Sequence, residues 1–133
     1  MAPHLFLMAI MQGKPLKKYG DGSMLRDYTF IQDIVLGILA AIDKNLPFEI
    51  FNLGHSQPIS LNEFIATAEK IVGKRAIIQP YPMQPGDVHT TYSDISKAKK
   101  LLGWEPTLSF EEGLRKQYEH IQKNKELYHV QNS

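Results

Sequence analysis

The stretch TFIQDIVLGILAAIDK, residues 29–44, decides what kind of fold the chain requires. Thr29 and Gln32 have the spacing of a capping box, in which each side chain satisfies a backbone N–H at the start of a helix. Further alanine and leucine side chains make this helix apolar on more than one face, so we expect it to be buried on two sides. The positions whose spacing predicts a helix over about residues 30–44 are Ile31, Ile34, Val35, Ile38, Leu39 and Ile42.

Helices and short strands alternate along the rest of the chain. Ser60 with Glu63, and Ser109 with Glu112, form two further capping boxes, and Ser96 is placed to cap a short helix. This alternation predicts the α/β class, in the form of a small mixed α+β domain with helices and a few short strands. Outside residues 29–44, the predicted helices are 3–13, 61–72, 97–103 and 110–124, and the predicted strands lie within 14–23, 48–54 and 75–82.

The predicted strands are too few and too short for a parallel sheet that is covered by helices on both faces. FEIFNLG, residues 48–54, is an apolar strand beside a helix that is apolar on two faces, so both require neighbours that the chain does not contain. The sequence therefore predicts a domain over residues 1–124 that lacks a companion, followed by a tail over residues 125–133. Trp104 is expected to pack on the core of this domain.

Composition and charge exclude several classes of protein. The chain has 133 residues, of which 43% are hydrophobic and 22% are charged, as expected for one folded domain. A net charge of +1 argues against binding to nucleic acid, and the absence of cysteine excludes disulfides and thiolate chemistry. No apolar run reaches the roughly 18 residues of a membrane-spanning helix, so we expect no membrane partner and a cytoplasmic location. The five histidines lack the spacing of metal ligands, so we expect no metal site.

Three blocks of the sequence resemble the C-terminal part of the extended short-chain dehydrogenase/reductase family. They are GDGSMLRDYTFIQDIVLGILAAI (20–42), FEIFNLGHSQPISLNEFI (48–65) and MQPGDVHTTYSDISKAKKLLGWEPTLSFEEGL (83–114). More narrowly, the blocks are similar to NAD-dependent nucleotide-sugar epimerases, above all to UDP-glucuronate 4-epimerases. The resemblance covers residues 2–122 and implies the substrate-binding portion of such an enzyme.

The resemblance implies epimerisation of a hexose at C4 by transient oxidation, with NAD on an N-terminal Rossmann domain and a Tyr-x-x-x-Lys pair as the base. This sequence contains neither G-x-x-G-x-x-G nor Tyr-x-x-x-Lys, so the Rossmann core is missing. We therefore expect no catalytic residues, no cofactor bound by this chain alone and no activity of the isolated chain. The alternative is a non-catalytic module, derived from an epimerase or a nucleotide-sugar dehydratase, that associates with itself or with a partner.

The resemblance places Arg26 on the diphosphate of a UDP-sugar. A planar guanidinium can bind two phosphate oxygens at once, which supports this role, and the alternative is a local surface pair between Arg26 and Asp27. The segment KKYG, with Lys17 and Tyr19, matches the strand that borders the uracil. Tyr19 could stack on the base, or it could be a half-buried aromatic side chain of the strand.

The turn QPGD supplies two further candidate site residues. Asp87 matches an acid near the ribose hydroxyls, and the alternative is a turn residue that bonds its own backbone. Gln84 stands where galactose-type epimerases carry a second phosphate-binding arginine, and it could donate to phosphate or ribose. As partners we expect a UDP-sugar, and either a second copy of the chain or the missing Rossmann domain.

Overall fold

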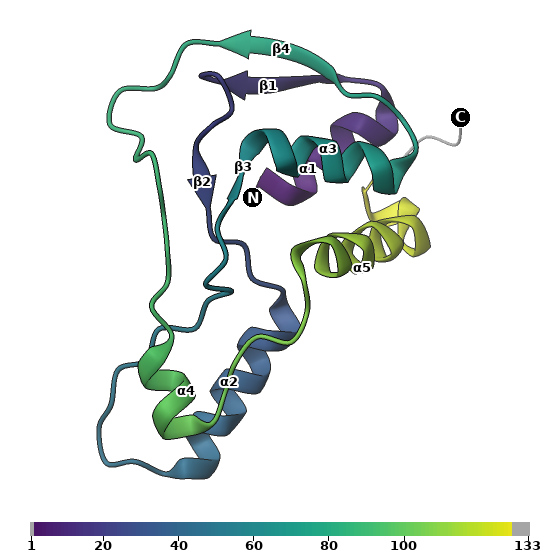
Figure 1. Cartoon of the computed structure of the whole chain (residues 1–133). Helices are drawn as coiled ribbons and strands as arrows, with labels where there is room; N and C mark the ends of the chain where they lie inside the picture. The colour runs from purple at the N-terminus through teal and green to yellow at the C-terminus, as the bar shows by residue number, and fades with distance from the viewer. Residues whose placement is uncertain (1, 129–133) are drawn as a thin grey trace.

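The structure, a computed structural model, describes residues 2–128. Helices predominate and the strands are short, as Figure 1 shows, so the predicted mixed α/β class is confirmed. The helices are α1 (Ala2–Gln12), α2 (Ile31–Lys44), α3 (Leu61–Val72), α4 (Ser96–Leu102) and α5 (Phe110–Lys123), the strands are β1 (Pro15–Tyr19), β2 (Leu25–Arg26), β3 (Ile59–Ser60) and β4 (Ile77–Tyr81), and η1 (Lys125–Tyr128) is a 3₁₀ turn.

One group of elements consists of α1, α3 and α5 with the strand pair β1–β4 (Figure 1). The two strands are parallel, and Lys17 lies opposite Gln79 while Tyr19 lies opposite Tyr81. The apolar face predicted for α3 is buried here, because Phe64 is fully inaccessible to solvent. Around it lie the other members of the larger apolar core, which are Leu7, Ile10, Leu16, Ile65, Ala68, Ile71, Leu114 and Ile121.

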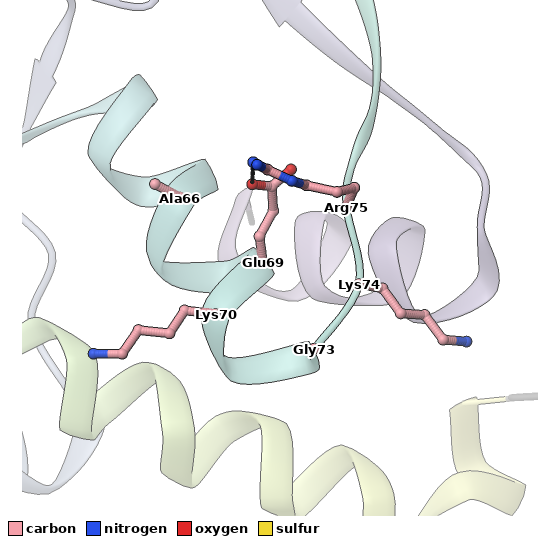
Figure 2. Close-up of a pocket in the computed structure, with 6 residues that line it drawn as sticks. All are labelled: Ala66, Glu69, Lys70, Gly73, Lys74 and Arg75. Atoms are coloured by element: carbon pink, nitrogen blue, oxygen red, sulfur yellow. Dashed lines mark hydrogen bonds and ion pairs between the residues drawn. The ribbon is translucent and has the colours of Figure 1, made fainter.

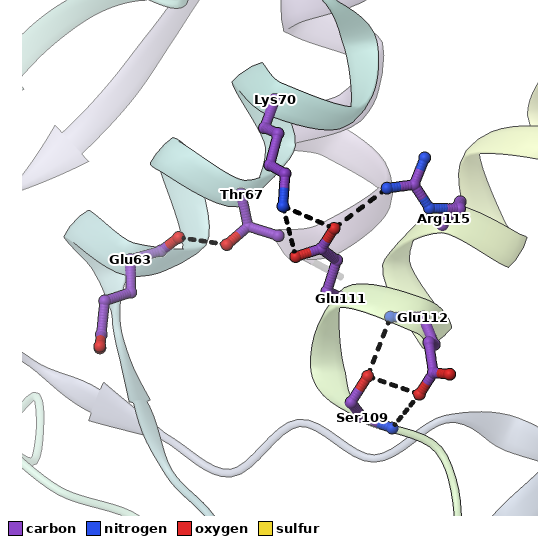
Figure 3. A network of polar contacts seen from close by, with 7 residues as sticks. All are labelled: Glu63, Thr67, Lys70, Ser109, Glu111, Glu112 and Arg115. Atoms are coloured by element: carbon purple, nitrogen blue, oxygen red, sulfur yellow. Dashed lines mark hydrogen bonds and ion pairs between the residues drawn. The ribbon is translucent and has the colours of Figure 1, made fainter.

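Both capping boxes predicted at the starts of α3 and α5 are present. The Ser60 hydroxyl accepts from the Glu63 N–H at 3.1 Å, and the Glu63 carboxylate accepts from the Ser60 N–H at 2.8 Å. Ser109 and Glu112 repeat the arrangement (Figure 3). Figure 3 also shows Glu111 of α5 between two cations, so that the ends of α3 and α5 are joined by charge as well as by apolar packing.

A second group consists of α2 and α4, which lie together at the other end of the molecule in Figure 1. Its smaller core contains Ala98, Leu102 and Trp104, so the predicted packing of Trp104 is confirmed. Gly37 permits the close approach of α2, since a Cβ at this position would lie 2.7 Å from a Leu53 methyl carbon and 3.1 Å from the Trp104 ring. Only one face of α2 is covered in this way within the described residues.

Asp33, in the first turn of α2, joins this second group to the segment that leads into α5. Its side chain is fully buried, and its carboxylate accepts hydrogen bonds from the Thr107 N–H, the Thr107 hydroxyl and the Leu108 N–H at 2.9–3.3 Å. In return, the Trp104 indole N–H donates to the Asp33 carbonyl at 2.9 Å. A buried carboxylate requires such donors, because burial without them would be costly.

The strand predicted over residues 48–54 is wrong. This segment lacks strand pairing in the structure. Phe51 and Leu53 pack on the α4 core, whereas Phe48 and Ile50 are 81% and 70% exposed. Since no strand of the described residues lies beside it, the apolar segment has nothing with which to form a ladder.

Two predicted helix caps are also wrong. Helix α2 begins at Ile31, so its N-cap residue is Phe30, which makes no side-chain cap, and Thr29 lies one position too early. At α4, Ser96 is already the first helical residue, and Asp94 accepts from both the Ser96 N–H and hydroxyl at 2.9 and 2.6 Å.

The segment predicted as a tail begins with η1. The Tyr128 ring of this turn lies 4.9 Å from the His4 ring, measured between ring centres. Residues 129–133 of the predicted tail lie outside the described residues, and the division of the chain at residue 124 stays a prediction.

Candidate functional site

The segment between β4 and α4 runs beside β2 and is hydrogen-bonded to it. The Leu25 N–H donates to the His89 carbonyl at 2.9 Å, and the Thr91 N–H donates to the Leu25 carbonyl at 3.1 Å. Leu25 and Thr90 form a parallel bridge, so this segment extends the two-stranded β2–β3 ladder by one contact. The residues just before His89 are thereby held close to Arg26.

Asp27 holds the same segment from the other side of Arg26. Its Oδ2 accepts from the Ser56 N–H at 3.0 Å and from the Ser93 N–H at 3.1 Å. Gly54 makes room for this junction, because a Cβ there would lie 2.3 Å from the Ser93 Cβ. Asp27 therefore bonds backbone N–H groups, and the alternative of a local Arg26–Asp27 pair does not describe the structure.

The backbone conformation of the turn Gln84–Asp87 determines where the Asp87 side chain lies. The Asp87 N–H donates to the Gln84 carbonyl at 3.2 Å, and Gly86 has φ +84°. Proline at the second position and a positive-φ glycine at the third are typical of a type II turn. The Gln84 side chain is exposed.

Arg26 and Asp87 form an ion pair although 61 positions separate them in the sequence. The distance from Arg26 Nη2 to Asp87 Oδ1 is 2.6 Å, and the two side chains are 26% and 33% exposed. Arg26 Nη1 also donates to the Leu25 carbonyl at 2.8 Å and to the His89 carbonyl at 3.3 Å. The structure thus brings together two of the five predicted site residues and fixes the guanidinium by its backbone contacts.

Lys17 and Tyr19 lie beside Tyr81, across the β1–β4 pair. The centres of the two tyrosine rings are 5.5 Å apart with planes inclined by 36°, and the Lys17 ammonium lies 5.5 Å from the centre of the Tyr81 ring. Tyr19 is half-buried, as one of its two sequence-based alternatives predicts. Tyr81 completes this aromatic patch, and its part could not be predicted because it depends on the strand register.

The turn after β1 connects this patch to the QPGD turn. Gly20 donates its N–H to the Tyr81 carbonyl at 2.9 Å, and a Cβ at Gly20 would lie 3.9 Å from the Met83 Cβ, next to Gln84. Within the turn, hydrogen bonds from the Ser23 hydroxyl and N–H lower the pKa of the Asp21 carboxyl. This acid therefore stays ionised beside the site at neutral pH.

A shallow hollow lined by Lys70, Lys74 and Arg75 lies at the C-terminal end of α3 (Figure 2). It is open to solvent, and Arg75 pairs with Glu69 at 2.9 Å while the Lys74 ammonium donates to the Met11 carbonyl. The negative end of the α3 dipole also faces it, which disfavours anions. The hollow is therefore poorly suited to bind an anion.

Within residues 2–128, no three His, Asp or Glu side chains gather as a metal site requires. In the same part of the chain no helix is both long enough and apolar enough to cross a membrane. Arg26 and Asp87 offer a guanidinium and a carboxylate, which are groups that bind phosphates and hydroxyls. The aromatic patch on the β1–β4 pair offers rings on which a flat ligand can stack.

Comparison with known proteins places this arrangement in a family. The family described as GDP-mannose 4,6 dehydratase matches residues 4–117. The chain is 45% identical, over 92% of its own length, to a UDP-glucuronate 4-epimerase of Thermodesulfobacterium geofontis, of which it spans 38%.

Solved structures agree with this assignment. The chain is similar to UDP-glucuronic acid 4-epimerase from Bacillus cereus in complex with UDP-glucuronic acid and NAD, with a TM-score of 0.86, 36% identity, and coverage of 92% of this chain and 40% of that one. An epimerase from Methanothermobacter thermautotrophicus gives a TM-score of 0.91 at 31% identity, with coverage of 97% and 39%.

These results confirm the resemblance inferred from the three sequence blocks. The chain spans less than half the length of each of these proteins, so their names describe longer molecules. The chain belongs to the nucleotide-sugar epimerase and dehydratase family of extended short-chain dehydrogenases, and it corresponds to the C-terminal part of those enzymes.

Proposed function

We propose that this chain binds the nucleoside diphosphate part of a UDP-sugar, with Arg26 on the diphosphate and Asp87 near the ribose hydroxyls. The contact between Arg26 and Asp87 across 61 sequence positions is the observation that carries the proposal. Two groups of opposite charge, held by backbone hydrogen bonds at one edge, suit a ligand with both phosphate oxygens and hydroxyl donors. Gln84, exposed in the same turn, is available to donate to either group.

The uracil is assigned to the aromatic patch formed by Tyr19 and Tyr81. Stacking on an aromatic ring suits a flat base, and Lys17 adds a positive charge beside the ring. Only Pro82 and Met83 separate Tyr81 from the QPGD turn, so the proposed ligand extends from the aromatic patch to this turn. This assignment rests on the resemblance and on the ring geometry together.

The reaction that we propose for the whole enzyme is the C4 epimerisation of a UDP-sugar of the UDP-glucuronate type, with NAD as cofactor. The residues of this chain do not fit NAD, because the Gly20–Gly22 turn leads from β1 into β2 rather than into a helix that could hold a diphosphate. We therefore expect no NAD-dependent turnover by the purified chain, and detection of such turnover would contradict the proposal. The cytoplasmic location expected from the sequence also stays a prediction.

Calorimetric titration with UDP, and then with UDP-glucuronate, tests the proposed binding site. We expect the wild type to bind and Arg26→Ala to lose binding, because the principal phosphate donor is removed. Arg75→Ala is the matched control: it removes the same charge from an exposed pair elsewhere, and its binding should match that of the wild type. Failure of the wild type to bind at millimolar UDP would show that this chain alone does not form the site.

A second candidate function is self-association or association with a partner domain. The observation in its favour is the uncovered side of α2, where Ile31, Ile38 and Ile42 are 50–67% exposed. Exposed apolar side chains gathered on one side of a helix are typical of an interface. The two functions are compatible, because Arg26 and Asp87 do not belong to this surface.

A further inference from the structure

The hydrogen bonds of Arg26 leave part of its guanidinium without an acceptor. Nη1 is occupied by the carbonyls of Leu25 and His89, and Nη2 donates once, to Asp87. A guanidinium has five N–H groups, so within the described residues the Nε–H and one N–H of Nη2 have no acceptor. The Nε and Nη2 groups are therefore the part of the guanidinium that a phosphate can approach, and Asp87 already holds one N–H of Nη2.

The carboxylate of Asp87 lies beside these N–H groups and brings the net charge of the Arg26–Asp87 pair close to zero. The 2.6 Å contact places a carboxylate where a phosphate bound to Arg26 would bring further negative charge. The two side chains are only 26% and 33% exposed, so this repulsion is screened less than it would be on an open surface. A small inorganic anion would therefore meet repulsion from Asp87, and it brings no alcohol hydroxyl that could donate to that carboxylate.

A ligand that carries hydroxyl groups next to its phosphates can interact favourably with both Arg26 and Asp87. A hydroxyl can donate to the Asp87 carboxylate and replace the hydrogen bond that Arg26 gives up when it turns to the phosphate. The Asp87 carboxylate then has a hydrogen-bond donor in the free protein, where the donor is Arg26, and in the complex, where the donor is the ligand hydroxyl. The Arg26 guanidinium is paired with the phosphate in the complex. The same acid thus opposes a bare anion and favours a nucleotide.

The position of Asp87 is fixed by the backbone, which separates it from an ordinary surface pair. Its own N–H is bonded to the Gln84 carbonyl, and the next residues are paired with Leu25 on the strand that carries Arg26. Exposed ion pairs without such support often contribute little and exchange freely. We propose that Asp87 is a specificity-determining residue that masks Arg26 against inorganic phosphates and selects ligands that join phosphate to a hydroxyl donor, an inference that rests on the proposed nucleotide site.

Titration with inorganic diphosphate and with UDP, on the wild type and on Asp87→Asn, tests this inference. Asparagine keeps the shape of the side chain and removes the charge. We expect the affinity for diphosphate to rise about tenfold, as removal of one like charge near contact distance implies, and the affinity for UDP to rise much less or to fall. Glu105→Gln makes the same change of net charge at the exposed Lys99–Glu105 pair and should alter neither affinity.

Equal changes in both affinities, or an unchanged affinity for diphosphate in Asp87→Asn, would overturn the inference. Its failure can be told from failure of the nucleotide site by the double variant Arg26→Ala/Asp87→Asn. In one outcome, neither the wild type nor any variant binds UDP, Asp87→Asn binds diphosphate, and the double variant does not. That outcome would support the masking of Arg26 by Asp87 and contradict the nucleotide site. In the other outcome, UDP binding requires Arg26, but the affinity for diphosphate is the same with Asp87 and with asparagine at this position. That outcome would support the nucleotide site and contradict the masking.

Discussion

At the scale of single residues, Asp33 has the most demanding environment in the described chain. It is fully buried, lies far in sequence from its donors, and accepts three hydrogen bonds from Thr107 and Leu108. Two of these come from backbone N–H groups that have no other acceptor in the described residues. The residue therefore ties the start of α2 to the segment before α5.

We predict that Asp33→Asn lowers the free energy of unfolding by about 1–3 kcal/mol, the usual cost of leaving a buried polar group without its partner. An amide offers one acceptor oxygen, and its NH₂ group would face a backbone donor. Urea unfolding followed by circular dichroism measures the loss. Asp43→Asn, on the exposed surface of the same helix, is the matched control and should change stability by less than about 0.5 kcal/mol.

Residues that act through their own neighbours in sequence could be predicted, and residues that act across the fold could not. The Ser60 and Ser109 caps were predictable because each partner lies three positions away on the same helix. The ion pair of Arg26 with Asp87 depends on which segment lies beside β2, and nothing local in the sequence specifies that pairing. Helix starts were predicted to within a residue or two, which was too coarse for Thr29 and Ser96.

At the scale of elements, Glu63 and Glu112 complete the capping boxes that stabilise the first turns of α3 and α5. Hydrogen bonds from the Ser60 N–H and hydroxyl lower the pKa of Glu63, and those from the Ser109 hydroxyl and N–H lower the pKa of Glu112. Because the folded-state pKa lies below the usual value, the ionised form favours the native state. This stabilisation is present above the ordinary carboxyl pKa and is lost as the pH falls through the lowered value.

We predict that the double variant Glu63→Gln/Glu112→Gln is less stable than the wild type at about pH 7 and that this difference shrinks towards about pH 3. Glutamine can still accept a hydrogen bond, but it carries no charge to lose. Denaturant unfolding at several pH values measures the difference, and Glu119→Gln, on the exposed side of α5, serves as the control. A difference that stays constant with pH would contradict the explanation.

The strand predicted over residues 48–54 illustrates the limit of element prediction. Its β-branched and aromatic residues favour extended backbone, but a strand also requires a neighbour. In the structure the segment is held instead by the ion pair of Glu49 with Lys97 of α4 and by the hydrogen bond from Asn52 to the carbonyl of Asp94, just before α4. Sequence alone could not separate an extended segment from a paired one.

At the scale of the whole molecule, the chain has two apolar cores joined by few segments (Figure 1). The covered side of α2 packs on the smaller core, whereas its other side is exposed, and in the loop that follows α2 Phe48 is 81% exposed. We propose that a second copy of the chain, or a partner domain, covers this surface. The expectation of two buried sides for α2 is thus met on one side only in the isolated chain.

We predict a dimer or a higher oligomer by light scattering at tens of micromolar, because association would remove this apolar surface from water. Ile38→Gln/Ile42→Gln should shift the chain towards the monomer. Leu5→Gln, at an exposed position of α1 in the other group of elements, changes the same kind of side chain and should leave the mass unchanged. A wild-type chain that is monomeric at this concentration would count against self-association.

The central claim, that Arg26 and the QPGD turn form a nucleotide site, is tested most directly by an amide NMR titration of the ¹⁵N-labelled chain with UDP. The account predicts that shift changes concentrate in residues 17–26 and 81–91, which hold the aromatic patch, Arg26 and Asp87. Arg26→Ala should abolish those changes, whereas Arg75→Ala should preserve them. Changes centred on the hollow at the end of α3, or no changes at millimolar UDP, would contradict the claim.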